Sequence, residues 1–368
     1  MRRSGRRSSA PAPEAVADVL TVGVEEEFVL LDTRTGAAVP AAPRILAAMP
    51  GEPDVVPEFL RFQIETTTGV CRSLSEVRAD LTRLRRRVGE AAADASCLAV
   101  ATAVAPFGTA PLVTADARYE RLAVRFPALV AGAGTCACHV HVGIPSRAAG
   151  VRALAGVRPW LGVLLGLSAN SPYAGGADSG WASTRYPLWS RRPTARPPAA
   201  WRDVAEYDAA VAEAIGSGAV PDARGGYFYA RLSPRYPTVE VRIADACLGV
   251  ADAVVLAGLV RALVATALRG EAVPQPSGTV LAQGLRAAAR QGLDRAGVAR
   301  LLAHVRPALE AAGDLEVVHR GWTALADRGG GAVRQRALRA VSATPAEFAA
   351  RLASATRGTE DESMEAVR

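Results

Sequence analysis

Four short stretches of the chain alternate polar and apolar residues, and each predicts a β-strand with two different faces. They are Gly23–Val29, Arg61–Glu65, Cys136–Val142 and Thr238–Ile243. Alternate side chains of a strand point to opposite faces of a sheet. Each stretch therefore sends Glu, Gln, His or Arg to one face and mostly Val, Ile, Phe or Cys to the other. The pattern predicts a sheet with one packed face and one charged face.

The remaining pattern predicts further strands early in the chain and mostly helices late. We expect strands over 20–31, 54–66, 97–105, 135–144, 226–232 and 237–245. We expect helices over 43–49, 74–88, 150–167, 252–268, 279–291, 296–312, 333–340 and 345–353. The capping box Ser73–Glu76 opens the second helix, and its Arg83–Arg87 cluster is expected on a solvated face. Irregular spacing between the strands favours an α+β fold with a mixed or antiparallel sheet.

The length of 368 residues, half of them hydrophobic, allows a large core. Residues 1–18 and 356–368 are expected to be disordered tails around a single catalytic domain, 19–355. The N-terminal stretch lacks the apolar core of a signal peptide. No uncharged apolar run reaches about 18 residues, so no membrane span is expected. We predict a cytoplasmic protein.

All positive side chains are arginine, because the sequence contains no lysine. A Walker A loop, a protein-kinase site and Schiff-base chemistry each need a lysine, so these classes are excluded. The net charge of +7 follows a general bias toward Arg, and no basic stripe interleaves with aromatic residues. No nucleic-acid partner is therefore expected.

Two strands carry the strongest candidates for metal binding. Glu25 and Glu27 share one strand face, and Glu26 points to the more apolar one. Same-face neighbours lie about 6.5–7 Å apart, and hard cations such as Mg²⁺ take carboxylate oxygens. His139 and His141 share the face of another strand, a pattern that also suits Zn²⁺. In isolation, a solvated acidic edge or a pair of ordinary histidines explains each motif equally well.

Further polar residues follow the same alternation or lie in a long loop. Glu240 and Arg242 form one same-face pair with Arg231 on the neighbouring predicted strand, and Gln63 and Glu65 form another. Ion pairs of this kind are also common on exposed sheets. The irregular stretch 168–198 is long enough to be functional. It contains the chain's only asparagine and several arginines, which bind phosphate and carboxylate groups well; the residues of interest there are Asn170, Ser171, Arg185 and Arg192.

Six motifs, taken in order, resemble the carboxylate–amine ligases of the glutamate–cysteine ligase type 2 group. They are Val22-Gly-Val-Glu-Glu-Glu-Phe28, Gln63-Ile-Glu65, Cys138-His-Val-His-Val-Gly143, Leu167-Ser-Ala-Asn-Ser-Pro172, Ala182-Ser-Thr-Arg185 and Pro237-Thr-Val-Glu-Val-Arg-Ile-Ala-Asp245. The resemblance covers about residues 20–340. It implies a glutamine synthetase-like fold, in which a curved, largely antiparallel sheet forms a funnel flanked by helices.

The resemblance also implies ATP-dependent joining of a carboxylate to an amine through an acyl phosphate, as in γ-glutamylcysteine formation. Mg²⁺ ions would be held by Glu25, Glu27, Glu65, His139 and Glu240. Catalytic arginines would be Arg231, Arg242 and Arg185, the first two neutralising the transferred phosphoryl group. Contacts to nucleotide or substrate would come from His141, Gln63, Asn170, Ser171 and Arg192. The substrates would be amino acids, and the assembly a homodimer or larger homo-oligomer.

Two other functions compete with this reading. A metal-dependent amidohydrolase would use His139 and His141, but such sites often require more histidines and a lysine carbamate. The remaining histidines, His304 and His319, fall in the predicted helical tail. The other alternative is a relative that has lost turnover. The retained carboxylates argue against it, since buried unpaired charges are costly unless something uses them.

Overall fold

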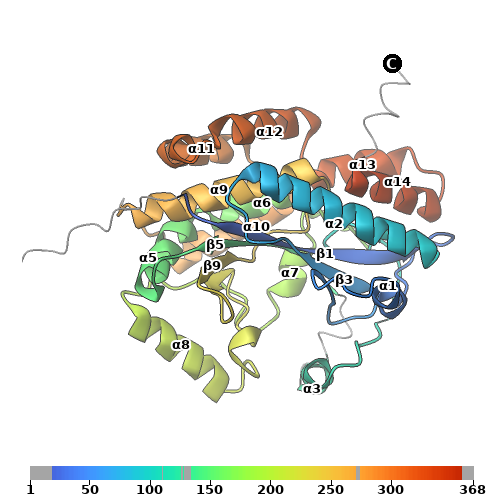
Figure 1. Ribbon diagram of the computed structural model, residues 1–368, viewed down its shortest axis with the longest axis horizontal. Coiled ribbons are helices and arrows are strands. Elements are labelled where there is room, and N and C mark those ends of the chain that lie inside the picture. The colour runs from blue at the N-terminus through green and yellow to red at the C-terminus, as the bar shows by residue number, and fades with distance from the viewer. Residues whose placement is uncertain (1–18, 110, 126, 128–133, 271–273, 359–368) are drawn as a thin grey trace, which may run out of the picture.

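The computed structural model describes residues 19–358 except 110, 126, 128–133 and 271–273 (Figure 1). The predicted N-terminal tail, 1–18, lies outside this range. The predicted C-terminal tail begins too early, because helix α14 (Pro345–Arg357) includes Thr356 and Arg357. Thr356 is only 2% exposed, and its hydroxyl accepts a hydrogen bond from the Ala101 N–H. The last turn of α14 is therefore part of the packed fold.

An antiparallel sheet organises the molecule, as predicted. Its strand order is β2-β3-β1-β5-β9-β8, and β4 also pairs with β1. The strand bounds are β1 Val22–Asp32, β2 Val55–Pro57, β3 Gln63–Thr67, β4 Cys97–Val100, β5 Cys138–Gly143, β8 Ala230–Leu232 and β9 Thr238–Val241. The first half of β1 pairs with β5 and its second half with β4, while β3 runs along its other edge. The central strand thus carries its side chains past most of the sheet.

The apolar face of the sheet is covered by helices. Figure 1 shows α2 (Leu74–Asp94) and α9 (Val250–Leu268) above the strands, with α11 (Arg295–Ala311) and α12 (Leu315–Arg328) as a further layer beyond α9. Apolar side chains of β1, β5 and β9, such as Val24, Val140 and Val241, join one core cluster with α9. Alternation along the strands therefore separates a packed face from a charged one.

Two helical segments are long and apolar enough to cross a membrane by length and composition. They are 147–168 and α9, and 56% and 78% of their most apolar windows are buried inside the protein. A helix that is apolar all round is buried in a large core or in a bilayer. The packing of α9 against α2, α5 (Arg147–Val157) and α12 accounts for its composition.

Helix α2 begins as its capping box predicts, since the Ser73 hydroxyl accepts the Glu76 N–H. The expectation that the Arg83–Arg87 cluster is solvated is wrong for Arg85, which is 2% exposed. Its guanidinium binds both oxygens of Glu26 at 2.9 and 2.6 Å. Glu26 points to the helix-covered face, so its charge needs a cation inside the core.

The predicted strand 54–66 is two strands joined by a turn. Pro57 ends β2, because proline cannot donate a hydrogen bond to the ladder. The Gln63 N–H donates to Leu60 O at 2.8 Å, and the Leu60 N–H donates to the Gln63 side chain at 3.3 Å. Strand β3 then returns antiparallel to β2. This turn brings Glu58 to the charged face of the sheet.

The other helices lie close to prediction where the sequence is periodic, except that the predicted helix 150–167 is two helices, α5 and α6, separated by a 3-10 turn at Arg158–Trp160. They are α1 Ala42–Ala48, α5 Arg147–Val157, α6 Leu161–Ser168, α10 Gly278–Gln291, α11 Arg295–Ala311 and α13 Gly331–Ala340. Among the described residues, helices α3 Ala117–Arg125, α8 Val204–Gly216 and α12 Leu315–Arg328 were not predicted, and neither was the short helix α7 (Arg185–Trp189) of the long loop. The long loop contains the short strands β6 (Tyr173–Ala174) and β7 (Ala177–Asp178) and the short helix α7 (Arg185–Trp189). Figure 1 shows α3, α7 and α8 on the side of the sheet away from α2.

Candidate active site

Two cavities meet on the charged face of the sheet. The small cavity has a volume of about 350 Å³ and is lined by carboxylates, histidines and arginines. The large cavity has a volume of about 1570 Å³ and extends past the start of β1 and the end of β5. Glu25, Glu65 and His141 line both. A ligand in one cavity can therefore meet a ligand in the other at these three side chains.

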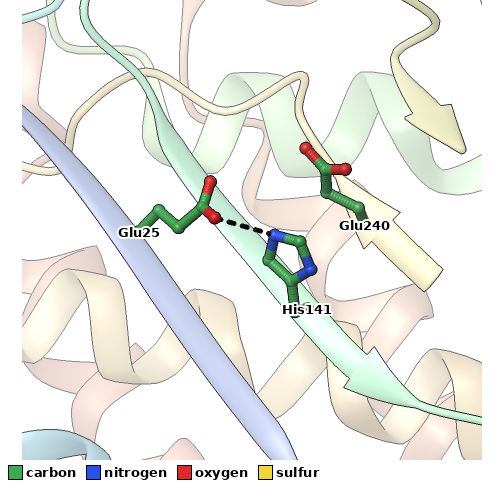
Figure 2. Close-up of side chains that lie close together, drawn as sticks. All are labelled: Glu25, His141 and Glu240. Carbon is green, nitrogen blue, oxygen red and sulfur yellow. Dashed lines mark ion pairs between the residues drawn. The ribbon is translucent and has the colours of Figure 1, made fainter. Parts of the chain in front are cut away.

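Three possible metal ligands at this junction are Glu25, His141 and Glu240 (Figure 2). We call this cluster the first carboxylate group, although it includes one histidine. One oxygen or nitrogen atom of each lies within 4.8 Å of the others. The residues come from adjacent strands, β1, β5 and β9, and His141 stands directly opposite Glu240 in the ladder. Strand register thus assembles the group from positions more than two hundred residues apart.

The second carboxylate group consists of Glu27, Glu58 and Glu65, whose oxygens also lie within 4.8 Å of one another. Glu27 and Glu65 face each other across β1 and β3, and Glu58 follows the end of β2. Burial and the charge of Glu58 raise the pKa of Glu27 to about 8. Burial and the neighbouring carboxylates, Glu25 first, raise the pKa of Glu65 well above its usual range. Without a bound cation, Glu27 therefore keeps its proton at pH 7, and the group avoids the charge of three ionised carboxylates.

The two histidines lie between the carboxylates in different ways. His139 Nδ1 lies 3.0 Å from Glu25 Oε2, and its Nε2 lies 3.9 Å from Glu27. Burial, and then the charge of Arg242, lower the pKa of His139 to about 4, so its ring is neutral at pH 7. His141 Nδ1 pairs with the Thr238 hydroxyl at 2.9 Å. Its buried Nε2 lies 3.3 Å from Glu25 Oε1 but makes no hydrogen bond with a described residue.

Two arginines flank Glu240. Arg231 binds both oxygens of this carboxylate, at 2.8 and 3.2 Å, and Arg242 binds one of them. Burial alone would raise the pKa of Glu240, but the charges of Arg242 and Arg231 outweigh it and lower the pKa. Both guanidinium groups line the small cavity. They place positive charge beside β9, whereas Glu27 lies on β1, two strands away in the sheet.

Arg185 supports the end of β9 rather than facing a free anion. Its two terminal nitrogens donate to Ile243 O and Arg242 O at 2.9 and 3.0 Å, and its guanidinium lies 4.4 Å from the centre of the Trp189 ring. It also lines the small cavity. The arrangement fixes the backbone of Arg242, so Arg185 positions a residue that faces the junction.

Asn170 and Ser171 do not line either cavity, although they were predicted to contact ligands. Both are fully buried. The Asn170 amide donates to Ala101 O and Ala246 O, and the Ser171 hydroxyl donates to Asp245 at 2.8 Å. These groups tie the long loop to the sheet. Gln63 does line the small cavity, and its amide is held by Thr135 O at 3.3 Å.

The donor set fits a hard divalent cation. Each carboxylate group offers several oxygens within one coordination sphere, and oxygen is the ligand that Mg²⁺ prefers. His141 adds an imidazole nitrogen that makes no hydrogen bond with a described residue, and the Thr238 hydroxyl orients its ring in the way that outer partners orient metal-bound histidines. Burial first, and then neighbouring carboxylates, raise the pKa values of Glu27 and Glu65, and a bound cation would favour their ionised forms.

The amidohydrolase alternative gains nothing from the remaining histidines. His304 lies on α11 and stacks on Trp160, and His319 lies on α12. Both helices pack on α9, on the apolar side of the sheet (Figure 1). Only His139 and His141, among the four histidines, reach the junction.

Two proteins of similar sequence share a provisional name, glutamate–cysteine ligase 2-2. A protein of Frankia alni, provisionally named glutamate–cysteine ligase 2-2, is 42% identical over 353 residues, 87% of this chain and 92% of its own length. A protein of Mycobacterium sp. strain KMS with the same provisional name is 41% identical over 341 residues, 86% of this chain and 93% of its own length.

Solved structures agree on the fold. Glutamate–cysteine ligase from Francisella tularensis, in complex with AMP, superposes with a TM-score of 0.70 at 12% identity, covering 92% of this chain and 89% of that protein. A bifunctional glutathione synthetase from Pasteurella multocida gives 0.63 at 13% identity, covering 92% of this chain and 52% of that one. The sequence model of glutamate–cysteine ligase family 2 matches residues 21–367. This chain therefore belongs to glutamate–cysteine ligase family 2, and it is an ATP-dependent carboxylate–amine ligase.

Proposed function

We propose that this enzyme uses ATP and Mg²⁺ to join the side-chain carboxylate of glutamate, or of a similar amino acid, to an amine such as that of cysteine. The observation that carries the proposal is the junction of two cavities at two separate carboxylate groups. An ATP-dependent ligase must bring a nucleotide and an acid together at a site that neutralises phosphate charge. The relatives' provisional names and the AMP complex of a structural neighbour support the same chemistry.

The two carboxylate groups define two sites for Mg²⁺. Glu25, His141 and Glu240 would hold one ion, and Glu27, Glu58 and Glu65 the other. This assignment exchanges the predicted roles of the histidines, because the hydrogen bond between His139 and Glu25 uses His139 to orient a ligand. Bound Mg²⁺ would neutralise the phosphate oxygens of ATP.

The shapes of the cavities separate the two substrates. The large cavity has apolar walls that include Leu20, Val22, Ile144 and Leu268, which suit an adenine ring. The small cavity, of about 350 Å³, has the charged walls that suit an amino acid. We place the nucleotide in the large cavity and the acid in the small one, so that the γ-phosphate and the carboxylate meet beside Glu25 and Glu65.

Catalysis in this arrangement depends on position and charge. The substrate carboxylate attacks the γ-phosphate, and the amine then displaces phosphate from the acyl phosphate, so no covalent bond to the protein is needed. Arg231 and Arg242 stand at the junction, where they stabilise charge on the transferred group. Arg185 keeps Arg242 in place through its backbone carbonyl.

The direct test is ATP- and Mg²⁺-dependent hydroxamate formation from L-glutamate with hydroxylamine as the amine. We expect release of ADP and phosphate, and Mg-ATP should raise the melting temperature of the protein. Glu65→Gln should lose both effects, whereas Glu90→Gln, on an exposed pair with Arg86, should keep them. Absence of any Mg-ATP effect on the wild-type protein, in turnover or in melting, would refute the proposal.

We also propose that the enzyme works in the cytoplasm as a homodimer or larger homo-oligomer. Size-exclusion chromatography with light scattering measures the assembly, and a monomeric mass at micromolar concentration would contradict this part of the proposal.

A further inference from the structure

One buried carboxylate follows strand β9 and is not among the described residues that line the two cavities. Asp245 lies shortly after the end of β9, at the end of the motif 237–245, and is fully buried. Its oxygen Oδ1 is 3.9 Å from the nearest nitrogen of Arg185, which is too far for a hydrogen bond. Burial of a carboxylate is costly unless other groups bond to it. The hydrogen-bond partners of Asp245 therefore indicate what this residue does.

Two buried serine hydroxyls connect Asp245 to helix α7. The Ser171 hydroxyl donates to Asp245 Oδ2 at 2.8 Å and accepts the Arg185 N–H at 3.2 Å. The Ser183 hydroxyl donates to Asp245 Oδ1 at 2.9 Å and accepts the Tyr186 N–H at 3.3 Å. Both serines are as fully buried as the carboxylate. One carboxylate thus fixes the first two N–H groups of α7 through hydroxyls that each donate one hydrogen bond and accept another.

Helix α7 is bonded back to the segment that carries Asp245. The Arg185 side chain donates to Ile243 O at 2.9 Å and to Arg242 O at 3.0 Å. The contacts therefore form a closed ring, from Asp245 through the two serines to α7, and from α7 back to the carbonyl groups just before Asp245. No member of such a ring can move alone without loss of a hydrogen bond. The ring restricts the backbone of Arg242, whose side chain lines the small cavity.

We propose that Asp245 is a positioning residue, which acts on the reaction through Arg185 and Arg242. This inference rests on the proposed function, in which the Arg242 guanidinium stabilises charge on the transferred phosphoryl group. The planar fork of an arginine acts only where its direction is fixed, and a displacement of about 1 Å can cost about 100-fold in rate. Asp245 touches no substrate in this arrangement, so its removal should lower kcat and leave the binding of ATP unchanged.

The test combines Asp245→Asn with Arg242→Lys in a double-mutant cycle, read as hydroxamate formation from L-glutamate. Asparagine keeps the shape of the side chain, but its nitrogen is a donor and cannot accept the Ser183 hydroxyl. In the otherwise wild-type protein, Asp245→Asn should lower kcat about 100-fold and leave the KM for ATP unchanged. In Arg242→Lys the same change should cost less than about 3-fold, because a flexible ammonium gains little from a fixed backbone.

Two further variants separate positioning from general stability. Asp252→Asn is the matched control, because Asp252 is also a buried aspartate, but it lies on α9 and pairs with Arg334. It should lower the melting temperature and leave kcat unchanged. Ser183→Ala breaks one arm of the ring and keeps the carboxylate, so it should lower kcat about 10-fold with the same dependence on Arg242. This variant carries the test if Asp245→Asn does not fold.

Three outcomes would overturn the assignment. Asp245→Asn and Ser183→Ala could keep the wild-type kcat, or they could lose as much in Arg242→Lys as in the wild-type background. They could also lose the effect of Mg-ATP on melting, which would assign Asp245 to the fold as a whole. Failure of the proposed function looks different, because the wild-type protein itself would then show neither turnover nor a Mg-ATP effect on melting.

Discussion

Three consecutive glutamates of β1 lie on the two faces of one strand and have different surroundings. Glu26 points toward the helices, is 1% exposed and is held by both arms of Arg85. Glu25 and Glu27 point to the cavities, where histidines, other carboxylates and solvent-filled space surround them. Chemically identical side chains therefore serve as a structural ion on one face and as candidate ligands on the other.

The difference lies in how each face compensates charge. Arg85 neutralises Glu26 inside the core and also donates to the carbonyl oxygens of Cys247, Leu248 and Thr356. Glu27 instead has two carboxylate neighbours, Glu58 and Glu65, and no described cation makes an ion pair with it. A protein that keeps carboxylates together without a counter-ion gives up stability at that site, which is a common property of functional sites.

Removal of the structural glutamate should have the largest effect. Glu26→Ala leaves the Arg85 charge buried without its partner, so the free energy of unfolding should fall by about 3–5 kcal/mol. Denaturant unfolding of the two proteins measures the difference. Glu27→Ala, one position away on the other face, is the matched control and should change stability much less, because its surroundings raise its pKa instead of stabilising its charge. Equal losses for the two variants would mean that the faces are not distinct.

Removal of a cavity glutamate should affect activity before stability. Glu65→Gln removes a charge from the second carboxylate group, so ATP-dependent turnover should fall about 100- to 1000-fold. The unfolding free energy without metal should rise, because Gln removes a carboxyl whose ionised form is disfavoured by burial and by neighbouring carboxylates. Steady-state rates and melting curves of one preparation measure both. A variant that is less stable and fully active would assign Glu65 to the fold.

Alternation along the strands was enough to predict which glutamates share a face, and the ordered motifs were enough to predict the antiparallel sheet. Side-chain direction in a strand is a local property that a sequence shows directly. Glu58 was missed because 54–66 was taken as one strand. In an unbroken strand Glu58 would have followed the face of Val56 and Leu60, whereas the chain turns between Pro57 and Gln63.

The predictions were wrong mainly where a side chain bonds to a residue far away in the sequence. Arg85 resembles its solvated neighbours by composition, and only the fold brings it to Glu26, 59 positions away. Asn170 and Ser171 belong to a motif of the family, but a motif does not tell whether a polar group meets a ligand or a buried carboxylate. Their partner, Asp245, lies about 75 positions away. Such networks follow from tertiary packing, which local pattern does not encode.

The two faces should also differ in their response to pH. The pKa of Glu27 is raised to about 8 from about 4.5, so the folded protein keeps a proton that the unfolded chain releases. Its stabilising contribution is complete below pH 4.5 and is lost as pH rises through 8. Without metal, Glu27→Gln should match wild type near pH 4.5 and gain relative stability of up to about 1.4 kcal/mol per pH unit until pH 8. Melting curves across this range test the sign, and a constant difference would contradict it.

The smallest effect is expected where the ion pair of α2 is exposed. Arg86 adjoins Arg85 in sequence and pairs with Glu90 at 3.0 Å, but the two side chains are 62% and 57% exposed. Solvent screens such a pair, so Arg86→Ala should change the unfolding free energy by about 0.5 kcal/mol or less, and salt should reduce even that. Arg85→Ala should cost several times more, because it leaves Glu26 and three carbonyl oxygens without donors. Denaturant unfolding of both variants at low and high salt compares adjacent arginines of one helix. Equal effects of Arg85→Ala and Arg86→Ala on the unfolding free energy would show that burial does not decide how much each ion pair contributes to stability. They would also remove the basis for separating Glu26 from Glu25 and Glu27.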